Sequence, residues 1–77
     1  MNYKMICPCC GNKTIEDEYD ICPVCFWEYD ESQNERPYST GGANSVSLNE
    51  ARANYERYGA CEKKFQDKVR KPLPEEE

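Results

Sequence analysis

The sequence predicts one small α+β domain in which something other than an apolar core supplies much of the stability. The chain has 77 residues, enough for a single domain. It contains six cysteines but only two Phe and one Trp, so its core must be small. Short strand-like segments come first and helix-like segments follow. Chains of this size usually need a metal, a disulfide or a partner to remain folded.

Three short segments near the N-terminus have β character: residues 3–6, 13–15 and 19–21. The acidic residues 16–18 between the second and third segments predict an exposed hairpin turn. Strands this short are marginal by themselves. The hairpin therefore needs support from the cysteines that surround it.

Residues 26–46 are predicted to form a loop. The segment opens with Phe26 and Trp27 and then becomes polar. We expect it to lie across the N-terminal part and to be held there by Phe26, Trp27 and Tyr38. The glycines of residues 41–44 would let the chain turn into the next element, since the spacing of a phosphate-binding loop is missing.

Two helices are predicted after this loop. Ser47 and Glu50 have the spacing of a capping box, so the first helix begins at Leu48, and Gly59 is a suitable stop. Its apolar face consists of Leu48, Ala51, Tyr55 and Tyr58.

The second helix is predicted over residues 61–70, where Cys61, Phe65 and Val69 recur every four residues. Pro72 and Pro74 end it. Residues 73–77 are proline-containing and acidic, and we expect a disordered tail. The predicted domain therefore spans residues 1–72.

The spacing of the cysteines points to metal chemistry. Cys7 and Cys10 form one CxxC pair, Cys22 and Cys25 form a second, and eleven residues separate the pairs. Zinc accepts four thiolates in a tetrahedron, and each two-residue gap lets one tight turn supply two of them. We predict one Zn²⁺ in a zinc-ribbon-like hairpin with two CxxC knuckles. Iron could use the same ligands and is the alternative.

The residues next to the ligands refine this prediction. Gly11 suits the positive φ that ends a CxxC turn, whereas Phe26 occupies the equivalent place in the second turn. We expect the second turn to pack more tightly against aromatic residues than the first. Cys9 and Cys61 are not needed as ligands. Cys61 is expected to be a buried thiol and Cys9 an inert, partly exposed one, although Cys9 as a swapped ligand or as a neighbour of the ligands stays open.

Charge and composition exclude several functions. With 10 basic and 15 acidic residues the formal net charge is −5, which disfavours nucleic-acid binding. No stretch is apolar enough for a membrane span or a signal peptide, so a cytoplasmic location is expected. The chain has no histidine, and a closed four-thiolate site has no open position, so an enzyme is not expected.

The predicted function is that of a non-catalytic zinc-binding protein that acts as an interaction or adaptor module, with Trp27 and Tyr38 on a loop that meets a protein partner. One alternative is a thiol redox protein that uses Cys9 with Cys7 or Cys10, with Cys61 as a candidate resolving thiol. Another is an acidic inhibitor or immunity protein for a basic partner. The oligomeric state stays open.

A family resemblance is carried by four segments of the chain: residues 7–11, residues 22–27, residues 41–44 with 47–52, and residues 59–61. The resemblance is to the bacterial cysteine-rich CPCC family. It covers the chain from about Cys7 to Pro72. It implies a small zinc-binding domain, and it leaves the biochemical role open because the family is named for its cysteines. It also implies that Phe26-Trp27, residues 41–44 and Cys61 belong to the family signature.

Overall fold

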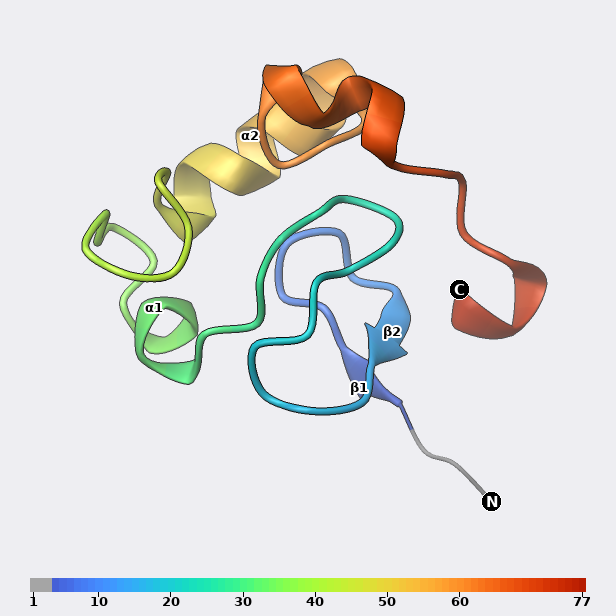
Figure 1. Ribbon diagram of the computed structural model, residues 1–77, viewed down its shortest axis with the longest axis horizontal. Helices are drawn as coiled ribbons and strands as arrows, with labels where there is room; N and C mark the ends of the chain where they lie inside the picture. The colour runs from blue at the N-terminus through green and yellow to red at the C-terminus, as the bar shows by residue number, and fades with distance from the viewer. Residues whose placement is uncertain (1–3) are drawn as a thin grey trace.

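The computed structural model describes residues 4–77, and it shows short strands followed by helices, as predicted (Figure 1). Residue 3 of the first predicted strand lies outside the described part. The elements, in chain order, are β1 (Met5–Ile6), β2 (Lys13–Ile15), α1 (Glu31–Glu35), α2 (Leu48–Tyr58) and the 3₁₀ turns η1 (Lys63–Lys68) and η2 (Pro74–Glu76). Across residues 4–77, no helix combines the length and the apolarity needed to cross a bilayer.

Each CxxC turn forms the tip of its own antiparallel pair. β1 and β2 pair across the first turn, with Met5 opposite Ile15. Ile21 and Glu28 form a single antiparallel bridge across the second. The predicted hairpin between residues 13–15 and 19–21 is therefore wrong. Each CxxC turn reverses the chain, so the segments on its two sides pair with each other.

Residues 16–18 do form the exposed turn that their charge predicts. The Asp20 carboxylate accepts hydrogen bonds at 3.0 Å from the backbone N–H groups of Glu16 and Asp17. The turn connects the two CxxC segments instead of closing a hairpin.

The segment predicted as a loop contains a short helix, α1. Asp30 caps its N-terminus, and the Asp30 side chain accepts a hydrogen bond from the backbone N–H of Gln33 at 3.2 Å. An aspartate followed three residues later by glutamine is a helix-start pattern, so the sequence contained a signal for this helix.

Buried polar side chains hold the rest of this segment in place. Gln33, only 2% exposed, donates from its amide to the backbone oxygens of Ser39, Asn44 and Val46. Asn44 in turn bonds to the backbone N–H and C=O of Glu28, both at 2.9 Å. Amide side chains offer donors and acceptors together, so two of them can order a long loop.

The predicted aromatic anchors of this segment are only partly correct. Trp27 is fully buried, and its indole N–H donates to the Asn34 side chain at 2.9 Å. Tyr38 is 84% exposed, so it does not anchor the segment. Its anchoring role is taken by the Gln33 and Asn44 network.

The helix α2 agrees with the prediction at both ends. The Ser47 hydroxyl accepts a hydrogen bond from the Glu50 N–H at 3.1 Å, and Gly59 ends the helix with φ +75°. Leu48 and Ala51 are buried in the core. The α2 side chain Arg52 donates to the Pro8 carbonyl at 2.8 Å, which ties the helix to the first CxxC turn.

The second predicted helix is a 3₁₀ turn, η1, instead of an α-helix over residues 61–70. Backbone bonds tie both flanks to the second CxxC segment: the Cys61 N–H donates to the Cys25 carbonyl and the Arg70 N–H to the Pro23 carbonyl. These two attachments fix the span of the segment. The side chain of Phe65 still packs inward as the pattern predicts.

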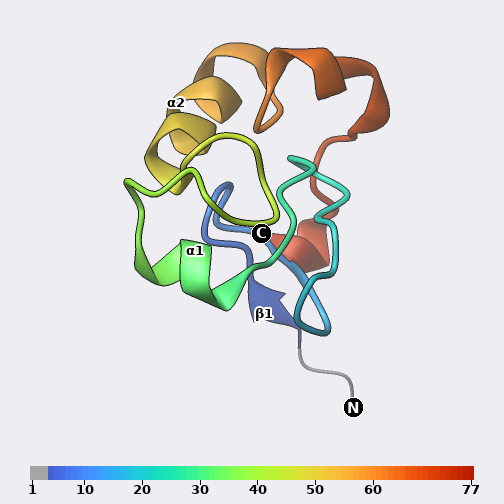
Figure 2. The ribbon, with the colours of Figure 1, turned by 60° about the vertical axis from the view of Figure 1, so that its left-hand side comes forward.

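The C-terminal residues form the turn η2 beside β2, where a disordered tail was predicted (Figure 2). Glu76 is only 4% exposed. Its carboxylate accepts two hydrogen bonds from the Arg70 guanidinium, both at 2.9 Å, and one from the Leu73 N–H at 2.8 Å. Paired charges of this kind can order a segment whose composition lacks apolar residues.

Candidate metal centre

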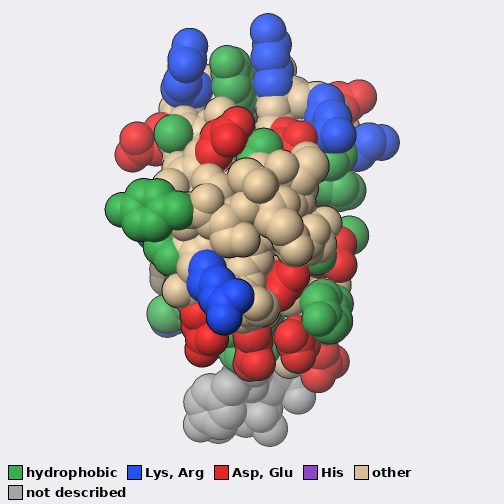
Figure 3. Space-filling model, turned by 90° about the vertical axis from the view of Figure 1, so that its left-hand side faces the viewer, with side chains coloured by type: hydrophobic (Ala, Val, Ile, Leu, Met, Phe, Trp, Pro, Cys, Tyr) green, Lys and Arg blue, Asp and Glu red, His purple; other side chains and the backbone are tan. Residues whose placement is uncertain are grey.

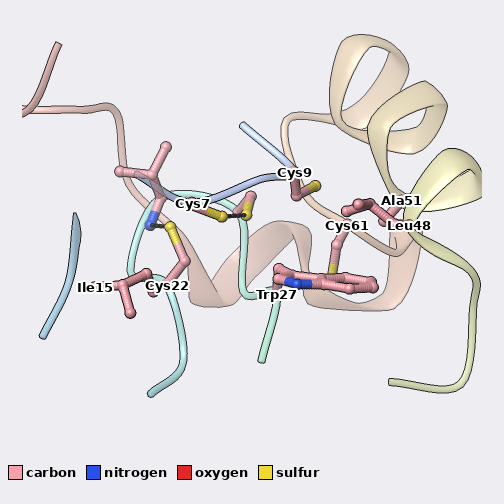
Figure 4. Close-up of a cluster of buried hydrophobic side chains, with 10 residues drawn as sticks. Cys7, Cys9, Ile15, Cys22, Trp27, Leu48, Ala51 and Cys61 are labelled. Carbon is pink, nitrogen blue, oxygen red and sulfur yellow. Dashed lines mark hydrogen bonds between the residues drawn. The ribbon is translucent and has the colours of Figure 1, made fainter. Parts of the chain in front are cut away.

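The cysteines form the centre of the buried core. Cys7, Cys22 and Cys25 have no exposed surface, and Cys10 is half-buried. Trp27, Leu48 and Ala51 lie on one side of the group, as Figure 4 shows. Segments distant in sequence therefore meet around the cysteine side chains.

The four predicted ligands come together in space. The Sγ atoms of Cys7, Cys10, Cys22 and Cys25 all lie within 4.8 Å of one another. Cys7 and Cys25 are 3.5 Å apart, and Cys10 and Cys22 are 3.7 Å apart. Four thiolates that bind one zinc ion tetrahedrally at about 2.3 Å lie about 3.8 Å from each other. The donor set therefore fits a single metal ion.

The two CxxC turns have the same backbone pattern. The Gly11 N–H donates to the Cys7 carbonyl and the Phe26 N–H to the Cys22 carbonyl, both at 2.8 Å. Gly11 has φ +82° and Phe26 has φ +73°. A turn that closes after the second cysteine requires this left-handed backbone, which glycine adopts without cost and phenylalanine does not.

The side chain of Phe26 offsets this strain by packing. Its ring lies against Phe65 with ring centroids 4.5 Å apart. Tilted aromatic pairs at this distance are favourable beyond the area that they bury. The prediction that the second turn packs against an aromatic residue is confirmed.

Cys22 is the cysteine best prepared to carry negative charge. Hydrogen bonds with Cys10, and then with Cys25 and Cys7, lower the pKa of the Cys22 thiol. The Thr14 hydroxyl lies 2.9 Å from the Cys22 sulfur, and the Val24 N–H donates to it at 3.4 Å. Hydrogen bonds to an ionised group favour that form.

Thr14 was not singled out in the sequence. It occupies the middle of β2, a strand of only three residues, and no spacing rule links it to Cys22. Only the fold places its hydroxyl at the sulfur.

The pKa of Cys25 moves in the other direction. Its hydrogen bonds with Cys10, Cys22 and Cys7 raise it, because neighbouring sulfurs that hold the negative charge keep the Cys25 proton in place. Four thiols this close cannot all ionise by themselves. A bound dication removes that restriction, since a coordinating thiol is deprotonated outright.

The two remaining cysteines lie beside the group, near Leu48 and Ala51 (Figure 4). Cys61 is fully buried as predicted, and burial raises the pKa of its thiol to about 12. Cys9 is only 7% exposed, so the prediction of a partly exposed thiol is wrong. Cys9 belongs to the same buried cluster as Leu48 and Ala51 of α2.

The sequence of this chain matches the family description "Cysteine-rich CPCC" over residues 5–76, nearly its whole length. The chain belongs to the cysteine-rich CPCC family. The match continues past residue 72, so the CPCC region includes the turn η2 that was predicted to lie outside the domain. No curated protein shows significant similarity to the chain. Family membership and the four clustered cysteines together fit a small metal-binding protein.

Proposed function

We propose that this CPCC protein binds one Zn²⁺ through Cys7, Cys10, Cys22 and Cys25, and that the ion is structural and not catalytic. The observation that carries the proposal is the gathering of four Sγ atoms within 4.8 Å. Four thiolates would complete a tetrahedron and leave no position for water or substrate. The ion would therefore stabilise the folded structure.

The small core explains why such an ion would be needed. Few large side chains are fully buried apart from the cysteines, and Trp27, Ile15 and Leu48 are the largest apolar ones. Structural zinc contributes on the order of 10 kcal/mol in small domains. This contribution would exceed what a core of this size supplies.

Native mass spectrometry of the protein, purified without added metal, tests this proposal. We expect one bound zinc per chain, and replacement by Cd²⁺ with a thiolate charge-transfer band. A protein that carries iron would identify the alternative ion. A protein that carries no metal and accepts none would overturn the proposal.

The proposed role of the folded domain is to bind a protein partner with a basic surface. Tyr19 is 57% exposed and Ile21 47% exposed, so apolar surface is open to solvent beside the second CxxC turn. The negative charge of Glu18, then that of Asp30, raises the pKa of Tyr19, with smaller contributions from burial, Glu28 and Glu31, so the surface near this ring is acidic. Acidic side chains gather at the lower end of the face that carries α1 (Figure 3). An apolar patch with an acidic rim suits a basic partner.

Charge reversal tests this surface. A pull-down with metal-loaded wild-type protein would be compared with the double variant Glu18→Lys and Glu31→Lys, which alters the acidic rim. Glu56→Lys, on an exposed position of α2, is the matched control. We expect the rim variant alone to lose the captured partner, and the captured complex to weaken as salt rises. Equal capture by all three proteins would contradict the proposal.

The burial of the two additional cysteines weighs against the thiol redox alternative. Cys9 is 7% exposed and Cys61 is fully buried. A redox thiol must be reached by its oxidant or its substrate. Rapid alkylation of Cys9 in the metal-loaded protein would revive this alternative, and the identity of a captured partner would show whether the protein acts as an inhibitor.

A further inference from the structure

A cavity of about 550 Å³ lies between the β1–β2 hairpin and the C-terminal turn η2. Its volume falls within the range of small-molecule sites, roughly 300–1,000 Å³. Figure 2 shows η2 beside the hairpin. The cavity is separate from the cysteine group and is lined by Lys4, Ile6, Lys13, Arg70, Leu73, Glu75 and Glu76.

The wall of this cavity already binds a carboxylate. The Arg70 guanidinium holds Glu76 through two parallel hydrogen bonds of 2.9 Å, and the Leu73 N–H adds a third at 2.8 Å. The hydrogen bonds from Arg70, and then from Leu73, lower the pKa of Glu76 to about 2. The positive charge of Arg70 therefore balances the negative charge of the ionised Glu76 within the wall.

Two further cations line the cavity. Lys4 and Lys13 line it, and neither takes part in an ion pair among residues 4–77. Glu75 is the one lining carboxylate that no cation holds at salt-bridge distance in that part of the chain. In a chain of formal net charge −5, this is a local excess of positive charge. Such an excess attracts anions.

The cavity also has apolar walls. Ile6 is 58% exposed and Leu73 is 44% exposed, although both belong to ordered elements or their caps. An inorganic anion would leave these side chains uncovered. An anion with an attached apolar group would cover them and meet the lysines at the same time.

We propose that this cavity is a ligand site for a small organic anion, in which Lys4 and Lys13 bind a phosphate or carboxylate group and Ile6 and Leu73 contact the apolar body. The residues that line the cavity include no cysteine of the metal centre and no residue of the proposed acidic rim. In the metal-loaded protein, this proposal is therefore tested separately from the proposed function.

The experiment is an NMR titration of the metal-loaded protein at constant ionic strength. The probes are phenyl phosphate, benzoate and inorganic phosphate. We expect phenyl phosphate, benzoate or both to give saturable shifts at the amides of Ile6, Lys13 and Leu73. The organic anion that binds shows whether the site prefers a phosphate or a carboxylate group. Inorganic phosphate should bind more weakly because it lacks the apolar part.

Three variants locate the site. Lys13→Gln should weaken binding about fivefold, the upper end of the effect of losing one ion pair at an exposed position. Glu75→Gln should strengthen binding about twofold, since it removes a repelling charge at an exposed position. Lys68→Gln, an exposed lysine of η1 outside the cavity, is the matched control and should leave binding unchanged. All three changes are at exposed residues, so folding should persist.

Three outcomes would overturn this proposal. In the first, neither organic anion gives saturable shifts. In the second, inorganic phosphate binds as tightly as phenyl phosphate, which removes the role of the apolar walls. In the third, Lys68→Gln weakens binding as much as Lys13→Gln, which indicates general attraction to lysines.

Discussion

Gly42 has no side chain, and this absence leaves room for the buried polar network around Asp30 and Gln33. A Cβ atom at Gly42 would lie 2.7 Å from the Asp30 carboxylate and 2.7 Å from the Gln33 amide oxygen. Both of these side chains are buried and hydrogen-bonded, so neither can move aside cheaply. The close approach of the chain to α1 therefore requires glycine.

We predict that Gly42→Ala lowers the free energy of unfolding by about 1–3 kcal/mol, the usual cost of overpacking. Gly41→Ala is the matched control, because a Cβ there would meet nothing closer than the Ser39 hydroxyl at 4.0 Å. Urea denaturation of the two metal-loaded variants measures the difference. Equal stability of both variants would contradict this prediction, because it would show that the Asp30 and Gln33 side chains can shift at little cost.

The six cysteines differ in function because of their positions. We predict that Cys22→Ser lowers metal affinity by an order of magnitude or more, since the best-stabilised thiolate is lost. Cys61→Ala should keep one metal per chain, because this side chain lies outside the four-sulfur group. Titration with a chromophoric chelator measures both affinities. Loss of metal from Cys61→Ala equal to that from Cys22→Ser would contradict the assignment.

At the scale of the element, local caps and turns explain most of the secondary structure. The start of α2 is fixed by Ser47, and its end by the left-handed Gly59. We predict that Ser47→Ala destabilises the protein by about 1 kcal/mol, the typical value of an N-cap. Ser45→Ala is a suitable comparison, since the exposed Ser45 hydroxyl bonds, within residues 4–77, only to the Glu62 side chain. Thermal unfolding of both variants would show whether the cap has this value.

The turn η2 is an element that charge, and not apolar burial, holds in place. The pKa of Glu76 falls from an ordinary 4.5 to about 2 through its bonds with Arg70 and Leu73. A lowered folded-state pKa means that docking of the turn is fully stabilised above about pH 4.5 and weakens as the pH falls toward 2.

We therefore predict that Glu76 remains ionised at pH 4.5 in the metal-loaded protein, which carbon NMR of its carboxyl group can follow. In Arg70→Gln the same carboxyl group should be substantially protonated at that pH, because its main hydrogen-bond donor is gone. A half-protonated Glu76 in the wild-type protein at pH 4.5 would show that the turn is not docked as described.

At the scale of the whole molecule, the segments of the chain converge on one buried group of sulfur atoms. The β1–β2 hairpin, the second CxxC segment and α2 all contribute to the core around the cysteines. Trp27 lies fully buried within it and reports on its integrity. Loss of the ion should therefore affect the entire fold.

We predict that a strong chelator exposes Trp27, shifts its fluorescence to longer wavelength and abolishes the near-ultraviolet circular dichroism signal, and that added Zn²⁺ restores both. The control is chelator in the presence of excess zinc. Unchanged Trp27 fluorescence in a metal-free protein would show that the core is sufficient without the ion.

The sequence by itself determined the features that depend on local spacing. The two CxxC pairs predicted which four cysteines gather, and Ser47 with Gly59 predicted α2. These predictions succeed because ligand pairs in one tight turn and helix caps both act within a few residues. The spacing of Asp30 and Gln33 is also a local signal for α1, although it lies in a polar segment.

The features that depend on contacts between segments are visible only in the folded chain. The tertiary structure paired the strands across each CxxC turn, shortened the last helix between its attachments to Cys25 and Pro23, and docked Glu76 on Arg70. It also buried Cys9. In each case a hydrogen bond, an ion pair or burial between segments outweighs the weak local preference of a short segment. The partners can be six residues apart, as Arg70 and Glu76 are, or in separate parts of the chain, as Cys25 and Cys61 are.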